Sequence, residues 1–312
     1  MCQAFFPRLM PDQRQDKTMR EAKGQYRVNF GAKKEGSTVR RKTRIKKPQK
    51  IREFRILSSK ALLKEEKTLL YFMKLRFNMP FTLLAQLFHV HRTTASDVFK
   101  NVLANHHQVA CALMHWPTRK AVDGTMPECF KTKFPRTRCV LDASEVKIEA
   151  PSEVASQVLF YSNYKASHTI KFLVSISPSG FISYISDAYG GRTTDAQITT
   201  ESGILHFLES GDEVMCDKGF PSIESDLLDL NTFLVMPPFK RRNMLQFSDE
   251  ENKVGYKIAS IRIHVERAIA RMKQFEILKF LERSLFLDYM DQILVCIAFI
   301  VNHFPPLIKQ QK

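Results

Sequence analysis

Residues 257–273, KIASIRIHVERAIARMK, constrain the fold more than any other segment of the chain. Apolar residues recur there at steps of three and four, which predicts a helix with one apolar face. These residues are Ile258, Ile261, Val265, Ala268 and Met272. Beside this stripe, Arg262, Glu266 and Lys273 fall within a narrow arc of the helix surface. We therefore expect the helix to bury one face and to present a carboxylate flanked by two cations.

Glu266 has two interpretations from this segment alone. It is either an exposed partner of Arg262, one helical turn away, or a catalytic carboxylate. Two isolated aspartates upstream favour the second interpretation, because each follows an apolar, strand-like run: Asp142 after residues 139–141, and Asp217 after residues 213–216. The three carboxylates are therefore one candidate site.

The positive charge of the chain is concentrated near its beginning. The sequence carries a formal net charge of +16, from 48 Lys and Arg against 32 Asp and Glu. Residues 1–60 hold 18 of the basic and 5 of the acidic residues, so the rest of the chain is nearly neutral. This distribution predicts a polyanionic partner, and double-stranded DNA is the natural one.

Residues 1–55 lack hydrophobic periodicity and are predicted to be a basic, disordered arm. They include the cluster RRKTRIKKPQK, residues 40–50, which suits a nuclear-import signal, a phosphate-binding arm or both. A solvated tail with no specific role is the alternative. The expected location of the protein is the nucleus.

The cysteines and the apolar runs argue against several other classes of protein. The six cysteines show no CxxC spacing and follow no signal peptide, so we expect reduced thiols in an intracellular protein. Their spacing matches no zinc motif, and no zinc is predicted. The most apolar run, Ile293–Val301, is too short to span a bilayer, so no membrane partner is expected.

Residues 56–116 are predicted to form a small all-α helix-turn-helix domain. A long helical segment ends at Asn78-Met79-Pro80, residues 81–88 suit a short helix, and a tight turn precedes a third, amphipathic helix. Polar residues at the start of the third helix suit phosphate and base-edge contacts. These are Arg92, Thr93, Thr94, Ser96 and Lys100. One residue departs from the pattern, because His91 stands where a capping Ser or Thr would be expected.

Residues 117–138 are interpreted as a basic connector, and residues 139–312 as a mixed α/β domain. Strand-like runs alternate there with helical segments. The runs cover residues 139–149, 170–177, 181–186, 213–216 and 232–236. The first strand is expected to end near Asp142 or to resume after it. Asp195 is expected in the first turn of a helix that Thr193 or Thr194 caps and that runs through Ile204.

This order of elements matches a ribonuclease-H-like fold, a mixed sheet with flanking helices. In that fold the end of the first strand, the end of the fourth strand and a late helix converge at one edge of the sheet. Asp142, Asp217 and Glu266 occupy those three places. Such carboxylates can hold two divalent cations that activate a water or a 3′-hydroxyl for phosphodiester displacement, and an all-oxygen shell suits Mg²⁺ or Mn²⁺.

Several segments, in their order along the chain, carry a resemblance to a known family. They are VLDASE, SNYKASHTIKFLVSISPSG, YGGRTTD, VMCDKGF, VMPPF and IASIRIHVERAIARMK. Together they resemble the DDE superfamily endonucleases of PIF/Harbinger-type transposases, in the branch usually associated with THAP zinc fingers. The preceding segment LLYFMKLRFNMPFTLLAQLFHVHRTTASDVF resembles the helix-turn-helix of that branch. The resemblance covers roughly residues 56–308.

The resemblance implies roles for individual residues. Asp142, Asp217 and Glu266 match the catalytic DDE triad, which implies that they hold two divalent metal ions. Asp195 matches a fourth acidic position at the metal site, although an Asp favoured by the helix dipole is the alternative. Basic residues are expected to contact the DNA backbone or to orient the carboxylates. These are Lys218, Lys240, Arg241, Arg242, Arg262 and Lys273.

Two departures from the family pattern limit what the resemblance implies. Ala259 stands seven residues before Glu266, where related bacterial transposases carry a tyrosine. Residues 1–55 contain no THAP-like Cys/Cys/Cys/His pattern. Recognition of transposon ends would then be left to the helix-turn-helix or to a separate DNA-binding partner protein.

The activity implied by the resemblance is metal-dependent hydrolysis at transposon ends, followed by strand transfer to target DNA. Because two ends must be joined, a homo-oligomer on DNA is expected. Two alternatives stay open: a domesticated nuclear DNA-binding or adaptor protein that does not cut, and an inactive truncated product of a decaying element. The intact acidic residues favour the nuclease, and the missing finger favours the alternatives.

Overall fold

The computed structural model describes residues 61–239 and 246–308. The predicted basic arm, residues 1–55, and the basic run Lys240–Arg242 lie outside the described residues. The chain divides into two units, and every described helix and strand lies in the second, Leu62–Lys312.

Three helices open the described part of the chain: α2 (Lys64–Phe77), α3 (Phe81–Leu87) and α4 (Arg92–Leu113). Asn78 ends α2 in a left-handed conformation with φ of 48°. The three helices bury one shared set of apolar side chains, which includes Leu70, Tyr71, Leu84, Phe99 and Leu103. The predicted helix-turn-helix layout is confirmed.

His91 is the N-cap residue of α4, although it is neither Ser nor Thr. Its Nδ1 accepts a hydrogen bond from the backbone N–H of Thr93 at 3.4 Å and lies 2.8 Å from the Thr93 hydroxyl. An unprotonated imidazole nitrogen therefore takes the place of the usual capping hydroxyl. The residue that departs from the sequence pattern still performs the function of a cap.

A mixed sheet of eight described strands follows, with β1 (Thr137–Ile148) at its centre. On one side β1 pairs antiparallel with β3 (Ser167–Ile176). On the other side it pairs parallel with β6 (Glu213–Met215), which pairs parallel with β7 (Phe233–Val235). The other strands are β2 (Tyr161–Ser162), β4 (Ile182–Ile185) and β5 (Tyr189–Gly190), all paired with β3, and β8 (Phe280–Leu281), paired with β1.

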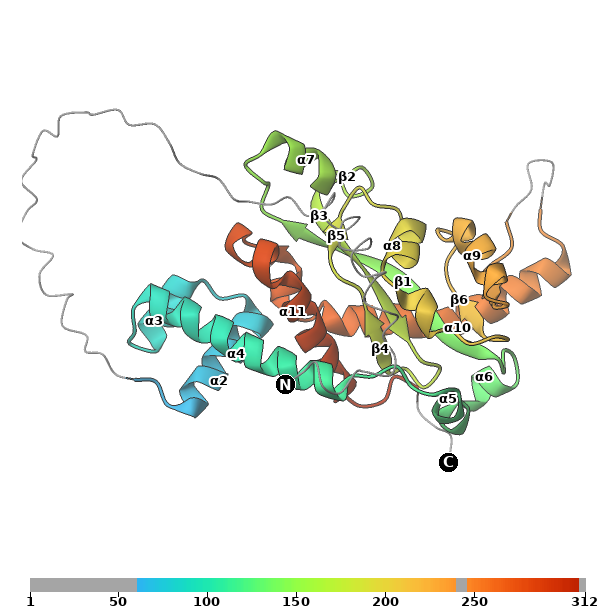
Figure 1. Cartoon of the computed structure of the whole chain (residues 1–312), viewed down its shortest axis with the longest axis horizontal. Coiled ribbons are helices and arrows are strands. Elements are labelled where there is room, and N and C mark those ends of the chain that lie inside the picture. Colours follow the sequence, from blue (N-terminus) through green and yellow to red (C-terminus); the bar gives the residue numbers. More distant parts are fainter. Residues whose placement is uncertain (1–60, 240–245, 309–312) are drawn as a thin grey trace, which may run out of the picture. The chain divides into compact units, whose positions relative to one another are not determined.

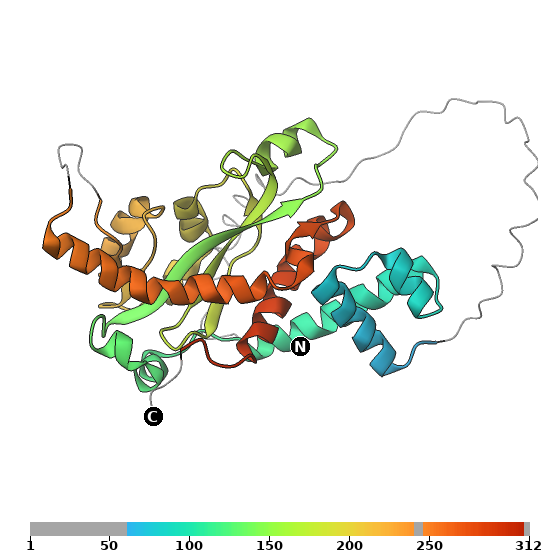
Figure 2. The same cartoon turned by 180° about the vertical axis from the view of Figure 1, so that it is seen from behind.

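Helices cover both faces of this sheet. On one face α10 (Asp249–Met272) and α11 (Arg283–Asn302) share a buried cluster with Val140 and Phe172. Figure 2 shows α10, in orange, lying across β1, in green. On the other face a second buried cluster joins the sheet to two short helices, α8 (Asp195–Glu201) and α9 (Glu224–Asp229) (Figure 1). This arrangement is the predicted ribonuclease-H-like α/β fold.

The helix-turn-helix packs against the helices that cover the sheet, because α4 contacts α11. The described part also contains three short α-helices, α5 (Arg119–Thr125), α6 (Glu128–Lys131) and α7 (Val154–Phe160). It contains three 3₁₀ helices as well, η4 (Ile204–Phe207), η5 (Pro221–Ile223) and η6 (Glu276–Leu278). No helix among the described residues has the length and apolar character that a membrane span requires.

The sequence indicated an end of the first strand near Asp142, but the strand passes through this residue without a break. β1 continues to Ile148, and its ladder with β3 runs without interruption from Val140 to Lys147. Asp142 lies within that ladder, opposite Val174. A paired neighbour strand therefore stabilises the extended backbone beyond a polar residue that, in the sequence alone, looks like a strand end.

Two helix boundaries also differ from the predictions. The helix that carries Glu266 begins at Asp249, well before residue 257, because Ser248 and Glu251 form a reciprocal capping box. The helix predicted to run from Asp195 to Ile204 ends at Glu201.

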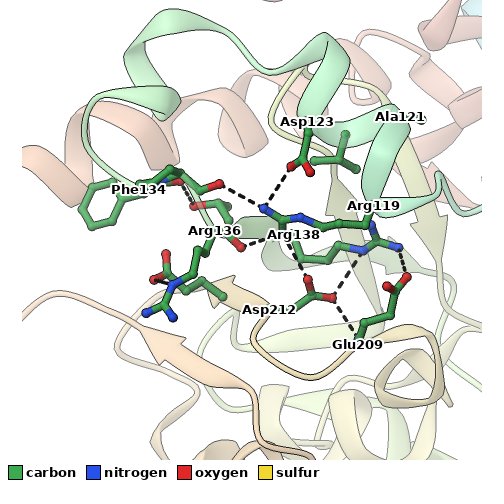
Figure 3. A network of polar contacts seen from close by, with 12 residues as sticks. Arg119, Ala121, Asp123, Phe134, Arg136, Arg138, Glu209 and Asp212 are labelled. Carbon is green, nitrogen blue, oxygen red and sulfur yellow. Dashed lines mark hydrogen bonds and ion pairs between the residues drawn. The ribbon is translucent and has the colours of Figure 1, made fainter.

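The connector is held against the sheet by a buried ion network (Figure 3). Asp212 lies just before β6, and only 3% of its side chain is exposed. Arg119 Nη1 donates to Asp212 Oδ1 at 3.1 Å, and Arg138 Nε lies 3.5 Å from Asp212 Oδ2. Arg138 also donates to the carbonyl of Pro117 at 2.8 Å and lies over the Trp116 ring. The basic residues of the connector therefore fix the beginnings of β1 and β6 next to each other.

Candidate active site

Asp142 and Asp217 point to the same face of the sheet from neighbouring parallel strands. Val140 of β1 pairs with Met215 of β6, and each aspartate lies two residues further along its segment. Because side chains alternate along a strand, each aspartate faces the same way as the residue two before it. Val140 and Met215 share a buried cluster with Ile261 of α10. Both carboxylates are therefore on the face that α10 covers.

The helix α10 contributes Arg262 and Glu266 to this face. Arg262 Nη1 donates to Asp217 Oδ1 at 3.2 Å, and Arg262 Nη2 lies 3.9 Å from Glu266 Oε1. The guanidinium is buried, with 9% of the side chain exposed, whereas Asp217 and Glu266 are 51% and 57% exposed. Arg262 is thus a central cation between two open carboxylates. The simple interpretation of Glu266 as an exposed partner of an exposed Arg262 is therefore incomplete.

Asp142 is the most buried of the three carboxylates, and its ionisation is correspondingly costly. Burial raises its pKa from 3.8 to about 6. The positive charge of Arg262 and the backbone N–H of Ala143, 2.9 Å from Asp142 Oδ1, oppose this rise. The negative charges of Asp217 and Glu266 add to it, so all three carboxylates share one electrostatic environment.

The donor set is suitable for hard divalent cations, but its arrangement here is that of an arginine-neutralised site. Oxygen-only carboxylate ligands are what Mg²⁺ and Mn²⁺ prefer. In the described part of the chain, no three His, Cys, Asp or Glu side chains are grouped closely enough to hold a metal ion together. Arg262 occupies the space between Asp217 and Glu266, and its Nε is buried without a hydrogen-bond partner among those residues. The chemistry of the donors fits a metal, and Arg262 is the group that a metal would replace.

Asp195 belongs to a separate ion cluster. Its Oδ1 accepts a hydrogen bond from Lys171 Nζ at 3.1 Å, and Lys171 also lies 3.6 Å from Glu145 Oε1. Glu145 and Lys171 are direct partners in the β1–β3 ladder and alternate with Val146 and Ile170, which face α10. The sheet therefore separates the Glu145–Lys171 pair from Asp142.

Asp195 nevertheless approaches the chain segment that carries Asp217. A Cβ atom on Gly219 would lie 2.9 Å from Asp195 Oδ2, so only glycine fits at that position without displacing the carboxylate. Asp195 is also in the first turn of α8, with Thr194 as the N-cap, as predicted. Both sequence interpretations of Asp195 thus have a geometric basis, and its role as a metal ligand stays a prediction.

The remaining basic candidates near the site differ in their surroundings. Lys273 ends α10, and burial lowers its pKa, although the charges of Asp142 and Glu145 partly compensate. Lys218 is exposed, with its Nζ 5.6 Å from the centre of the Phe247 ring. Arg262 is buried and ion-paired, so in this conformation it contacts carboxylates and is not available to the DNA backbone.

The candidate DNA-contacting residues of the helix-turn-helix lie at the start of α4, as expected. Arg92, Thr93 and Thr94 are exposed there, and Ser96 is half-buried. Lys100 is also half-buried, and its Nζ lies 5.2 Å from the ring centre of Tyr289 on α11. The first four residues present polar groups to solvent, whereas Lys100 faces the neighbouring helix. Contact of these residues with DNA stays a prediction.

Sequence reasoning missed Lys171 as a site residue. For Glu145, three residues after Asp142, it favoured a charge at the edge of a strand over a residue that supports the metal ligands. The side chain of Glu145 is only 8% exposed and accepts a hydrogen bond from Thr169 at 2.8 Å. The available signal was a lysine at an alternating position of the hairpin strand 170–177. Its pairing with Glu145 depends on the register between the two strands, which the sequence does not specify.

Comparison with known proteins identifies two regions of this chain. A family described as DDE superfamily endonuclease matches residues 141–302, which is more than half of the chain. A family described as the helix-turn-helix of DDE superfamily endonuclease matches residues 60–112. No curated protein and no solved structure matches the chain. The first match covers Asp142, Asp217 and Glu266, and the second covers α2, α3 and nearly all of α4.

Proposed function

Because the chain belongs to the DDE superfamily endonucleases, we propose that it binds double-stranded DNA and hydrolyses phosphodiester bonds with Asp142, Asp217 and Glu266. The endonuclease region and the transposase-type helix-turn-helix together support a transposase-like nuclease. The finer proposal is hydrolysis at transposon ends and strand transfer to target DNA by a nuclear, PIF/Harbinger-type enzyme. The resemblance of the ordered segments supports that finer assignment.

One observation supports the proposal most directly. Three carboxylates from β1, the segment after β6 and α10 surround a single buried guanidinium, and the two outer carboxylates remain half-exposed. A purely structural ion cluster would have its charges matched and covered. This cluster has an excess of negative charge facing solvent, which is the requirement for holding divalent cations at a phosphodiester bond.

Divalent ions held by these carboxylates would activate the attacking water and stabilise the leaving oxygen. The chain's own residues have separate tasks in this proposal. Asp142 must be ionised to act as a ligand, and its raised pKa places that requirement near pH 6. Arg262 must turn away from Asp217 and Glu266, since its guanidinium lies between them. Lys218 and Lys273 are placed to neutralise the DNA backbone or the carboxylates.

The DNA would be positioned by the helix-turn-helix, with the exposed start of α4 at its surface. Assembly as a homo-oligomer is proposed because two ends must be joined. A separate DNA-binding partner protein is proposed for recognition of the ends, because the family branch that the chain resembles is usually associated with THAP zinc fingers.

A second candidate function is that of a non-cutting DNA-binding or adaptor protein. The observation that favours it is the 3.2 Å contact between Arg262 and Asp217, which gives Asp217 a cationic partner without any metal. If Arg262 keeps this position in the presence of divalent ions and DNA, the fold supports DNA binding alone.

A plasmid-nicking assay with Mg²⁺ or Mn²⁺ separates these functions. We expect the wild-type chain to nick supercoiled DNA and Asp142→Asn to lower the rate by more than about 100-fold, since a metal ligand matters at least as much as the groups that support it. Glu276→Gln is the matched control, because Glu276 forms only a surface pair with Lys279. Nicking that survives Asp142→Asn would overturn the nuclease assignment.

A further inference from the structure

A cavity of about 380 Å³ opens beside the sheet, between α7 and the paired strands β2 and β3. Its size falls within the range of small-ligand sites, about 300–1,000 Å³. Its walls combine apolar, aromatic, amide and cationic side chains, and they include no carboxylate. They include Val154, Val158, Tyr161, Asn163, His168 and Arg192.

Aromatic rings are exposed at this cavity to an extent that folding does not require. Tyr164, next to the cavity wall at Asn163, is 86% exposed, and Tyr161 is 40% exposed. The Tyr161 ring is held edge-on by His168, with 5.5 Å between ring centres. One ring is thus fixed in orientation and another is free at the rim. Exposed aromatic faces of this kind are stacking platforms for nucleobases.

Two cations accompany these rings and lack acidic partners. Lys165 Nζ lies 4.6 Å from the centre of the Tyr164 ring and makes no ion pair with a described residue. Arg192 is exposed and likewise has no ion-pair partner in the described part of the chain. In a DNA-binding protein, unpaired cations beside aromatic rings provide the contacts that a nucleotide phosphate needs.

The backbone around the cavity is built to hold these groups in place. A Cβ on Gly190 would lie 2.5 Å from the carbonyl oxygen of Leu159, and a Cβ on Gly191 would clash with Thr169 Oγ1. Only glycines therefore let the segment before Arg192 pack this closely against α7 and β3. On the other side, Ala166 takes a left-handed φ of 46°, which is strained for a residue with a side chain.

The cavity is also electrostatically connected to the carboxylates. The charge of Lys165 lowers the pKa of Lys273, whose ammonium in turn interacts with Asp142 and Glu145. Arg192 precedes Asp195 by three residues.

We propose that this cavity binds one unpaired nucleobase of the DNA, stacked on Tyr164 or Tyr161, with Lys165 and Arg192 at the adjoining phosphates. The inference rests on the proposed function for its substrate class, but it assigns a site that neither metal binding nor the helix-turn-helix provides. The base can come from a single strand or from a duplex in which it is extruded, since both present the same free ring face.

The test is fluorescence anisotropy with labelled 12-nucleotide probes and the full chain, in EDTA. The probes are a mixed-sequence single strand, a duplex with one central mismatch, and the fully paired duplex. We expect Tyr164→Ala to weaken single-strand binding about tenfold, the loss expected when a base loses its stacking partner. Tyr164→Phe should retain binding, because the ring face remains.

The three probes identify the source of the base. If Tyr164→Ala weakens binding of the single strand alone, the base comes from a strand end. If it also weakens binding of the mismatched duplex, the base is extruded from a duplex. Binding of the fully paired duplex should not change. Arg192→Gln should weaken binding and lower the salt dependence by about one counterion, whereas Tyr164→Ala should leave that dependence unaltered.

Tyr256→Ala is the matched control, because Tyr256 is 76% exposed on α10 and lies outside the cavity. Three results would each overturn the proposal. They are an equal loss of affinity in Tyr256→Ala and Tyr164→Ala, an equal loss of affinity for all three probes, and wild-type affinity in Tyr164→Ala. Because EDTA removes divalent ions, these results do not depend on cutting. Failure of the nuclease assignment would appear separately, as nicking that persists in Asp142→Asn.

Discussion

Two arginine–carboxylate clusters in this molecule use similar groups in opposite ways. In the connector network, Asp212 is almost fully buried and is contacted by Arg119, Arg138 and the backbone N–H of Glu209 (Figure 3). At the candidate active site, one buried Arg262 serves three carboxylates, two of them half-exposed.

The difference lies in how the charges are matched. Two arginines contact the one buried carboxylate of the network, Asp212, and their other carboxylate partners, Asp123 and Glu209, are more than half exposed. At the candidate site three carboxylates interact with Arg262 and the half-buried Lys273, so negative charge is left over. The comparison teaches that the pairing of the buried carboxylate, combined with the exposure of the others, separates a structural cluster from one with negative charge left to bind further cations.

The largest effect is expected from removal of the central carboxylate of the network. Asp212→Ala should lower the free energy of unfolding by about 3–5 kcal/mol, because buried Arg138 would keep only the exposed Glu209 as an ion-pair partner among the described residues. Urea unfolding followed by circular dichroism measures this. The control Asp123→Ala removes an exposed partner of Arg119 and should cost less than about 1 kcal/mol. Equal costs would mean that the network is not the structural cluster described here.

Substitution of Asp142 is expected to stabilise the protein, in contrast to substitution of Asp212. Its folded-state pKa, about 6, is above its ordinary value of 3.8, so the folded state holds the proton more tightly than the unfolded chain. The stabilising contribution of this group is thus fully present below about pH 4 and is lost as the pH rises through 6. Asp142→Asn should therefore stabilise the metal-free protein by about 2–3 kcal/mol at pH 7.

Denaturation of wild type and Asp142→Asn from pH 4 to pH 7.5 in EDTA measures this difference. The gain should shrink to about 0.5 kcal/mol at pH 4, where Asp142 is protonated in the folded state and only partly ionised in the unfolded chain. A variant that is less stable than wild type at pH 7 would show that ionised Asp142 is well compensated, like Asp212, and would break the comparison.

A smaller effect is expected when Arg262, the cation that contacts Asp217 and Glu266, loses its charge. Arg262→Gln should tighten Mn²⁺ binding about tenfold at pH 8, where Asp142 is ionised, because the guanidinium no longer competes for the carboxylates. Isothermal titration calorimetry measures the affinity, with Arg262→Lys as the charge-retaining control. Weaker binding in Arg262→Gln would mean that Arg262 helps to hold the ligands in place.

The smallest effect is expected for the stability of Glu266→Gln. Because Glu266 is 57% exposed and 3.9 Å from Arg262, its charge should contribute less than about 0.5 kcal/mol to the free energy of unfolding. The same substitution should abolish nicking if Glu266 is a catalytic ligand. A large loss of stability would mean that Glu266 has a structural role, like Asp212 in the connector network.

The sequence predicted those parts of the molecule that depend on local periodicity. The apolar stripe from Ile258 to Met272 led to α10, and the polar start of α4 was recognised from its pattern. The convergence of Asp142, Asp217 and Glu266 also followed from the order of elements. These features are encoded by residues close together in the chain or by a familiar succession of strands and helices.

Features that depend on pairing between distant segments escaped prediction. The 3.2 Å contact of Arg262 with Asp217 joins residues 45 positions apart and requires the packing of α10 on the sheet. The continuation of β1 past Asp142 depends on its ladder with β3. The helix α7 has only seven residues, too few for a periodic signal, so the cavity beside it could not be anticipated.

The continuity of β1 also determines which parts of the active site can move. One end of the strand carries Arg138, inside the buried network, and its other end pairs with β8 through Lys147 and Ile148. Asp142 lies between these two attachments, so we expect the strand to hold its position. If the three carboxylates bind divalent ions, the Asp217 segment and the α10 side chains would then move toward Asp142.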